Sequence, residues 1–110
     1  MEKLGYSVLE TRYRFERAEI DLICFDPKQQ VSDGEIVFVE VKTRRTESFG
    51  LPEDAVTESK RRNIAKAAAA YLYEAKMEGA ACRFDVVAIN IGGPEAEVRH
   101  LKHAFEEPGD

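Results

Sequence analysis

Hydrophobic and polar residues alternate along the first half of the chain in short blocks that predict strands. The segments 6–14 and 19–25 alternate between apolar and polar side chains, the first weakly and the second clearly. The segment 36–42 is apolar at consecutive positions, which is typical of a central strand covered on both faces. Polar, turn-forming residues at 15–17 and 26–34 separate these blocks. We therefore expect three consecutive strands.

The period then changes to that of a helix. The segment 43–52 has no period and contains Gly50 and Pro52, so it is predicted to be a loop. Beyond it, apolar residues recur at the spacing of one helical face: Ile64, Ala67, Ala68, Tyr71, Leu72 and Ala75. Thr57 is the predicted N-cap of this helix, and Gly79 its predicted C-terminal stop.

The last third of the chain returns to strands. Residues 83–91 predict an interior strand, 92–94 a turn, and 95–101 a short edge strand, whereas the tail 106–110 is expected to fray. Three strands, a helix and two strands predict one α/β domain over residues 1–110, with a mixed sheet of about five strands and a helix packed on it.

The composition fits a globular, cytoplasmic protein. The chain is 44% hydrophobic and 34% charged, far from the composition of a disordered chain. It has no apolar run near the roughly 20 residues that cross a bilayer, and its start lacks the order of a signal peptide, so no membrane association is expected. Cys24 and Cys82 fall in apolar, strand-like runs and are predicted to be reduced thiols.

The distribution of charge is more informative than its total. A net charge of −5 excludes a protein that coats nucleic acid by electrostatics alone. Positive charge is nevertheless concentrated between Lys42 and Lys66, where seven basic residues stand against four acidic ones. This segment is either a solvated loop and helix face or the footprint of an anionic partner.

Two pairs of charged residues interrupt otherwise apolar strands. Side chains two apart in a strand lie on the same face, so Glu19 is expected beside Asp21, and Glu40 beside Lys42. The same alternation predicts that the opposite face of the first of these strands carries Ile20, Leu22 and Cys24. If the two strands are neighbours, three carboxylates and one ammonium group converge at their ends.

Such a cluster favours a metal ion. Three carboxylates at one end of an apolar sheet repel one another, and a divalent cation removes that cost. Oxygen-only ligands favour Mg²⁺ or Mn²⁺, which activate water for phosphodiester hydrolysis, and Lys42 would position that water or stabilise the transition state. An ion pair of Glu40 with Lys42, or across the strands, remains the structural alternative.

A resemblance to a known family makes this hypothesis more specific. It runs from about residue 5 to residue 105 and is carried by segments 18–23, 37–44, 49–56, 70–72 and 83–87, together with Lys60 and Arg61. The chain resembles the YraN-like family of predicted endonucleases, which belongs to the PD-(D/E)xK nuclease superfamily and is similar to archaeal Holliday-junction resolvases.

The resemblance implies a restriction-endonuclease-like core and a role for each charged residue. Asp21 and Glu40 match the metal-binding carboxylates, Lys42 matches the catalytic lysine, and Glu19 matches an extra acidic residue of the metal site. The chain departs from the family at Ala18, where members usually have glycine. Members also usually begin with a long helix that carries another acidic residue, and this helix is expected to be missing here.

Further basic residues are expected to bind phosphate. Lys60 and Arg61 lie in the first turn of the predicted helix and tilt toward its buried face, where the helix dipole also favours an anion. Arg44 and Arg45 follow the central strand and complete this expected nucleic-acid surface. Long basic side chains that merely cover the edge of the core are the alternative.

Other candidates carry less functional weight. Tyr71 lies on the apolar meridian of the helix and is predicted to be a core residue rather than a stacking platform for a base. His100 and His103 lack the carboxylate or cysteine spacing of a metal site.

The sequence therefore predicts a metal-dependent endonuclease, with DNA favoured over RNA as partner, branched DNA as one substrate and a homodimer as one assembly. Two alternatives stay open: a nucleic-acid-binding module whose nuclease site is inactive, and a protein-interaction domain that retains the fold.

Overall fold

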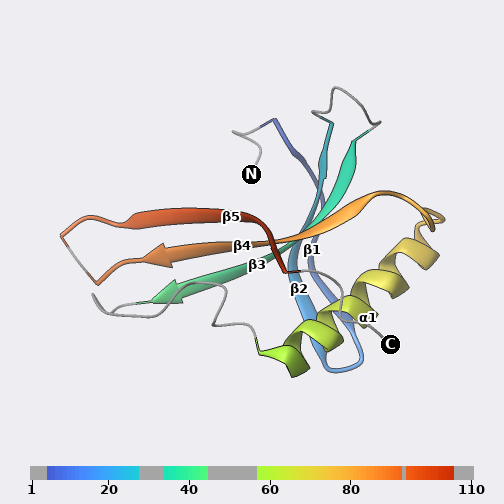
Figure 1. Cartoon of the computed structure of the whole chain (residues 1–110), viewed down its shortest axis with the longest axis horizontal. Coiled ribbons are helices and arrows are strands. Elements are labelled where there is room, and N and C mark those ends of the chain that lie inside the picture. Colours follow the sequence, from blue (N-terminus) through green and yellow to red (C-terminus); the bar gives the residue numbers. More distant parts are fainter. Residues whose placement is uncertain (1–4, 28–33, 45–56, 93, 106–110) are drawn as a thin grey trace.

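A computed structural model describes residues 5–27, 34–44, 57–92 and 94–105, which form a five-stranded sheet with one packed helix (Figure 1). The elements in chain order are β1 (Ser7–Phe15), β2 (Ala18–Asp26), β3 (Glu35–Arg44), α1 (Glu58–Glu74), β4 (Cys82–Asn90) and β5 (Glu97–Phe105). The predicted α/β class is confirmed. The predicted tail 106–110, and the predicted loop 43–52 beyond Arg44, lie outside the described residues.

The strands follow one another across the sheet in the order β1-β2-β3-β4-β5. The pairs β1/β2, β2/β3 and β4/β5 are antiparallel, whereas β3 and β4 are parallel. A parallel pair needs a crossover connection, and α1 lies in the segment that joins β3 to β4. β3 is the middle strand, as its continuous apolar run predicts.

Each face of the sheet carries its own apolar cluster. The cluster beneath α1 consists of Ile20, Ile23, Ile36, Phe38, Ile64, Ala67, Ala68, Phe84 and Val86. The apolar cluster on the opposite face has Tyr6, Cys24, Val37 and Val39 as its buried residues. Tyr71 packs at the margin of the first cluster, as predicted for a core residue.

Both cysteines are thiols rather than disulfide partners. Among the described residues, no helix is long and apolar enough to span a membrane.

The alternation of β2 shifts by one residue at Asp21, which corrects the expected placement of Ile20. Ile20 and Ile23 lie in the cluster beneath α1, whereas Leu22 packs on the opposite face. Strict alternation would place Ile20 with Leu22. On the neighbouring strand, Arg12 has φ 50, a left-handed conformation that breaks the regular extension of β1. The irregularity lies at the residue expected to bind metal.

The end of α1 also differs from the prediction, which assigned the stop to Gly79. The helix ends several residues earlier, and Lys76 takes the left-handed conformation (φ 58) that glycine usually supplies. The N–H of Met77 then donates to the carbonyl of Leu72 at 2.8 Å, which closes the last turn. At the other end Thr57 is the N-cap as predicted, because its hydroxyl accepts a first-turn N–H at 3.2 Å.

The edge strand β5 begins later and runs further than the predicted segment 95–101. Its pairing with β4 shifts between Phe84 and Val86, and His103 adopts φ 55 within this bulge. The carboxylate of Asp85 accepts the His103 N–H at 2.9 Å. A buried carboxylate thus satisfies a backbone donor that the bulge removes from the ladder.

Candidate active site

The ladder between β2 and β3 ends where the predicted catalytic residues begin. Its last described pair is Leu22 with Val39, and the next residues along the two strands are Asp21 and Glu40. The carboxylate of Asp21 accepts the N–H of Val41 at 2.7 Å. Asp21 therefore takes over a backbone hydrogen bond at the point where strand pairing stops, and its carboxylate is fixed beside β3.

Glu40 lies on the face of β3 that α1 covers, and only 8% of the residue is exposed. Two ammonium groups approach the same carboxylate oxygen, Oε1. The Nζ of Lys42, two residues along the strand, lies 3.5 Å away, and the Nζ of Lys60, in the first turn of α1, lies 3.7 Å away. The expected alignment of Glu40 with Lys42 and the inward tilt of Lys60 are both confirmed.

The charged forms of both Glu40 and Lys42 are disfavoured in this cluster. Burial raises the pKa of Glu40, and the nearby Asp21 raises it further, while Lys60 and Lys42 only partly oppose the shift. The contact with Lys60 lowers the pKa of Lys42, and burial adds to this effect. The two lysines thus only partly offset the cost of burying the Glu40 carboxylate beside Asp21.

This donor set fits a hard divalent cation. Asp21 and Glu40 supply carboxylate oxygens from adjacent strands, and Mg²⁺ commonly uses one or two protein carboxylates while keeping several waters. A cation would offset the two effects that raise the pKa of Glu40, namely burial and the repulsion from Asp21. An anion such as phosphate would in turn relieve the crowding of Lys42 and Lys60. A metal ion with a bound phosphate satisfies both demands.

The structure does not bring Glu19 into this cluster. Its carboxylate pairs instead with Arg14 of β1 at 2.8 Å. In the described part of the chain, no group of three or more acidic, histidine or cysteine side chains is arranged to hold a metal ion. Of the three carboxylates expected to converge, those of Asp21 and Glu40 interact electrostatically, whereas that of Glu19 pairs with β1.

The basic residues assigned to phosphate binding are described unequally. Lys60 reaches the cluster, and Arg61 beside it is half-buried. The backbone of Arg44 ends β3, but its side chain lies outside the described part of the structure, as does all of Arg45.

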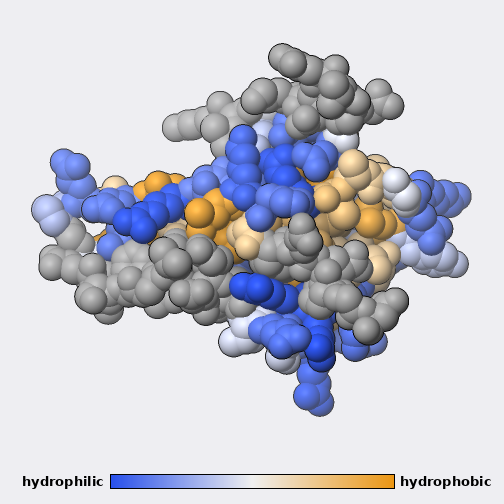
Figure 2. Space-filling view, in the orientation of Figure 1, coloured by the Kyte–Doolittle hydropathy of each residue, from blue (hydrophilic) through white to orange (hydrophobic). Residues whose placement is uncertain are grey.

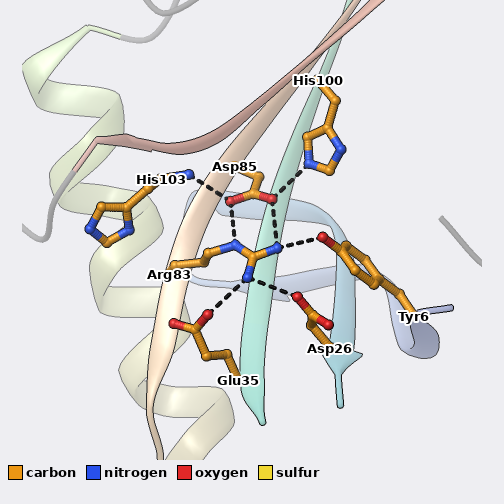
Figure 3. A network of polar contacts seen from close by, with 7 residues as sticks. All are labelled: Tyr6, Asp26, Glu35, Arg83, Asp85, His100 and His103. Carbon is orange, nitrogen blue, oxygen red and sulfur yellow. Dashed lines mark hydrogen bonds and ion pairs between the residues drawn. The ribbon is translucent and has the colours of Figure 1, made fainter. Parts of the chain in front are cut away.

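The sequence reasoning missed a second polar cluster, which is centred on Arg83 and lies on the face of the sheet away from α1. Figure 3 shows the guanidinium of Arg83 surrounded by Asp85, Asp26, Glu35 and Tyr6. Its shortest contacts are 2.7 Å to the Tyr6 hydroxyl and 2.8 Å to Glu35, with Asp26 and Asp85 each at 3.0 Å. These residues come from β2, β3, β4 and the approach to β1, so Arg83 connects the far ends of the fold.

Burial makes this cluster a structural element. The side chain of Arg83 is 7% exposed and that of Asp85 is fully buried. Burial alone would lower the pKa of Arg83, but hydrogen bonds to Asp85, Asp26 and Glu35 raise it above its usual value. His100 contacts Asp85 at 2.7 Å, so its described role is in this network. The signal in the sequence was a charged pair two apart, Arg83 and Asp85, inside an interior strand.

The protein is an α/β protein with a mixed sheet, one covering helix and two polar clusters on the sheet. One cluster is formed by Glu40, Lys42 and Lys60, and the other is the buried network of Arg83. The model of the uncharacterised protein family UPF0102 matches residues 1–89. The chain belongs to this family.

Curated relatives extend the match over nearly the whole chain. A UPF0102 protein of Geobacter sulfurreducens is 42% identical over 96% of this chain and 79% of its own length. A UPF0102 protein of Geotalea daltonii is 43% identical, with coverage of 96% and 80%. One of Lawsonia intracellularis is also 43% identical, with coverage of 93% and 73%.

Proposed function

We propose that this protein is a metal-dependent nuclease that hydrolyses phosphodiester bonds, with DNA as its substrate. The observation that carries the proposal is the cluster that Lys42 and Lys60 form around the buried carboxylate of Glu40, in which the pKa of Glu40 is raised and that of Lys42 is lowered. Such displacement is typical of functional sites. The resemblance to PD-(D/E)xK nucleases supports the same chemistry.

Asp21 and Glu40 would hold a Mg²⁺ or Mn²⁺ ion. When bound, such an ion lowers the pKa of a coordinated water and neutralises charge that develops on the phosphate. The N–H of Val41 fixes the Asp21 carboxylate in place, and burial restricts that of Glu40. Preorganised carboxylates bind a cation without having to be ordered first.

The lysines have separate roles. Lys42 shares the Glu40 carboxylate and has a lowered pKa, which suits a group that orients the attacking water or stabilises the transition-state oxygens. Lys60 projects from the first turn of α1, where backbone N–H groups and the helix dipole also attract an anion. It would hold the substrate phosphate rather than take part in the chemistry.

A second function is favoured by one observation. Glu19 is paired with Arg14 and contributes nothing to the cluster, so a protein that binds nucleic acid without cleaving it would also account for the lysines. Such a module would bind DNA with a strong dependence on salt but would release no product in the presence of metal.

Incubation of the protein with labelled branched, single-stranded and duplex DNA tests the proposal. Cleavage is expected with Mg²⁺ or Mn²⁺ and not with a chelator, and Glu40→Ala should abolish it. Lys102→Gln is the control, because Lys102 is exposed on β5 and its substitution removes a charge outside the cluster. Salt-sensitive binding without cleavage would support the inactive module instead. If the protein neither binds nor cleaves DNA, both proposed functions are contradicted.

A further inference from the structure

We propose a second phosphate seat, in the pocket between the β1–β2 turn and α1. This inference rests on the proposed function and extends it by naming where the substrate backbone runs after it leaves the Glu40 cluster. The pocket has a volume of about 170 Å³. Its lining residues are Phe15, Glu16, Arg17, Ala18, Asn63 and Lys66.

Two elements that are distant in sequence build this pocket. Phe15 pairs with Ala18, so Glu16 and Arg17 form a two-residue turn that ends the hairpin of β1 and β2. In Figure 1 this turn is the blue loop at the bottom of the view, below the first half of α1. Asn63 and Lys66 belong to that half of the helix and line the same pocket as the turn. The turn and the helix thus form opposite walls.

The pocket is connected to the candidate active site by a row of side chains on α1. Lys60, Asn63 and Lys66 follow one another at intervals of three residues, which is the spacing of a ridge on a helix surface. Lys60 is the residue whose ammonium reaches Glu40. From Lys60 to Lys66 the helix rises by about 9 Å. A strand with one phosphate at Lys60 could therefore place a nearby phosphate in the pocket.

The cations of the pocket are available to a ligand, in contrast to their neighbours. Arg14 pairs with Glu19, and Arg62 pairs with Glu58. Arg17 and Lys66 are exposed, and neither forms an ion pair within the described residues. The amide of Asn63 adds two further donors. Arginine, lysine and amide donors around a small hollow suit a phosphate group, whose oxygens are acceptors.

One acidic side chain, Glu16, also lines the pocket. A phosphate in the pocket would be attracted by two cations and repelled by this carboxylate. The lower edge of the molecule, where the hairpin turn and the start of α1 lie, is mostly hydrophilic in Figure 2, whereas most of the hydrophobic surface lies to the right of the centre of the view. This lower edge therefore suits a polar ligand, and the two cations of the pocket favour an anionic one.

The test is the affinity of labelled duplex and four-way-junction DNA for the full chain, measured across a salt series in Ca²⁺ to slow cleavage. Arg17→Gln combined with Lys66→Gln should weaken binding at least about tenfold and lower the salt slope by up to about two phosphate contacts. Glu16→Gln should have the opposite effect and tighten binding by roughly twofold to fivefold, because it removes a repulsion. Lys102→Gln should change neither affinity nor slope by more than its small effect on net charge.

Opposite effects of these substitutions are the specific signature. An unchanged salt slope in the double variant, or an unchanged affinity in Glu16→Gln, would overturn the second seat while leaving cleavage by the parent intact. Failure of the parent itself to bind or cleave DNA would instead overturn the proposed function. Far-ultraviolet circular dichroism and melting curves of each variant identify any loss of folding, and none of the substituted side chains is buried.

Discussion

Replacement of Arg83 by methionine should destabilise the fold more than any surface substitution. Methionine keeps most of the length and apolar stem of arginine but removes the guanidinium. Asp85 and Asp26 are 0% and 3% exposed as side chains, and both would lose a cationic hydrogen-bond partner at 3.0 Å. The Tyr6 hydroxyl would lose a donor at 2.7 Å. The variant therefore removes the guanidinium from two buried carboxylates, although Asp85 keeps its contacts with His100 and with the His103 N–H.

The magnitude follows from the number and burial of these contacts. Removing one partner of a buried ion pair typically costs about 3–5 kcal/mol. The contact with Glu35 adds little, because 25% of that side chain is exposed to solvent. A small domain is stable by about 5–15 kcal/mol, so the loss is a large fraction of the total. For a chain of this size, we expect the melting temperature to fall by roughly 15–30 °C.

Urea denaturation followed by circular dichroism measures the change directly. The midpoint should fall while the dependence on urea stays the same, since the surface exposed on unfolding is similar. In the double variant that adds Asp85→Asn, the loss should be smaller than the sum of the two single losses by about 1–3 kcal/mol. The network contributes little to stability if the free energy of unfolding of Arg83→Met lies within about 1 kcal/mol of that of the parent. The same conclusion follows if the losses caused by Arg83→Met and Asp85→Asn are additive.

Three further outcomes test other parts of the structure. In chelator, Asp21→Asn should melt at a higher temperature than the parent, because the substitution removes the repulsion between Asp21 and Glu40 while its amide oxygen can still accept the Val41 N–H. The increase in melting temperature that Mn²⁺ gives should be smaller than in the parent. A lower melting temperature in chelator would contradict repulsion between these carboxylates. Lys76→Gly should gain about 0.5–1 kcal/mol in urea unfolding, because glycine tolerates φ 58; a loss would contradict this. Burial, and then the hydrogen bond to Glu74, raise the pKa of Tyr13 from 10.0 to about 12, so this stabilisation is fully present below pH 10.0 and is lost as the pH rises through about 12. The stability difference between the parent and Tyr13→Phe should therefore narrow over that range, and a constant difference would exclude the link.

The strand and helix pattern could be predicted because hydrophobic periodicity is a local property. The continuous apolar run of 36–42 placed β3 at the centre of the sheet, and the helical spacing around Ile64 located α1. The helix end could not be predicted in the same way. Lys76 adopts a conformation that its residue type disfavours, and Met77, whose N–H closes the last turn, packs against the apolar cluster beneath α1 through tertiary contacts.

The candidate site was only partly visible in the sequence, for physical reasons. The period of two aligned Glu40 with Lys42, but it also paired Glu19 with Asp21, and the irregularity of β2 invalidates strict alternation at that point. The Arg83 network joins residues far apart in the chain. No local pattern contains such contacts, although a charged residue in an interior strand indicates that a partner must exist.

The rate at which Lys42→Ala cleaves DNA in Mn²⁺, measured in single turnovers beside the Mn²⁺ affinity, tests the proposed chemistry most directly. We expect the rate to fall by about a hundredfold or more, because one preorganised charge is lost from the transition state, while the Mn²⁺ affinity is largely retained. Lys60→Ala should mainly weaken DNA binding. Cleavage by Lys42→Ala at the rate of the parent would remove Lys42 from the proposed mechanism.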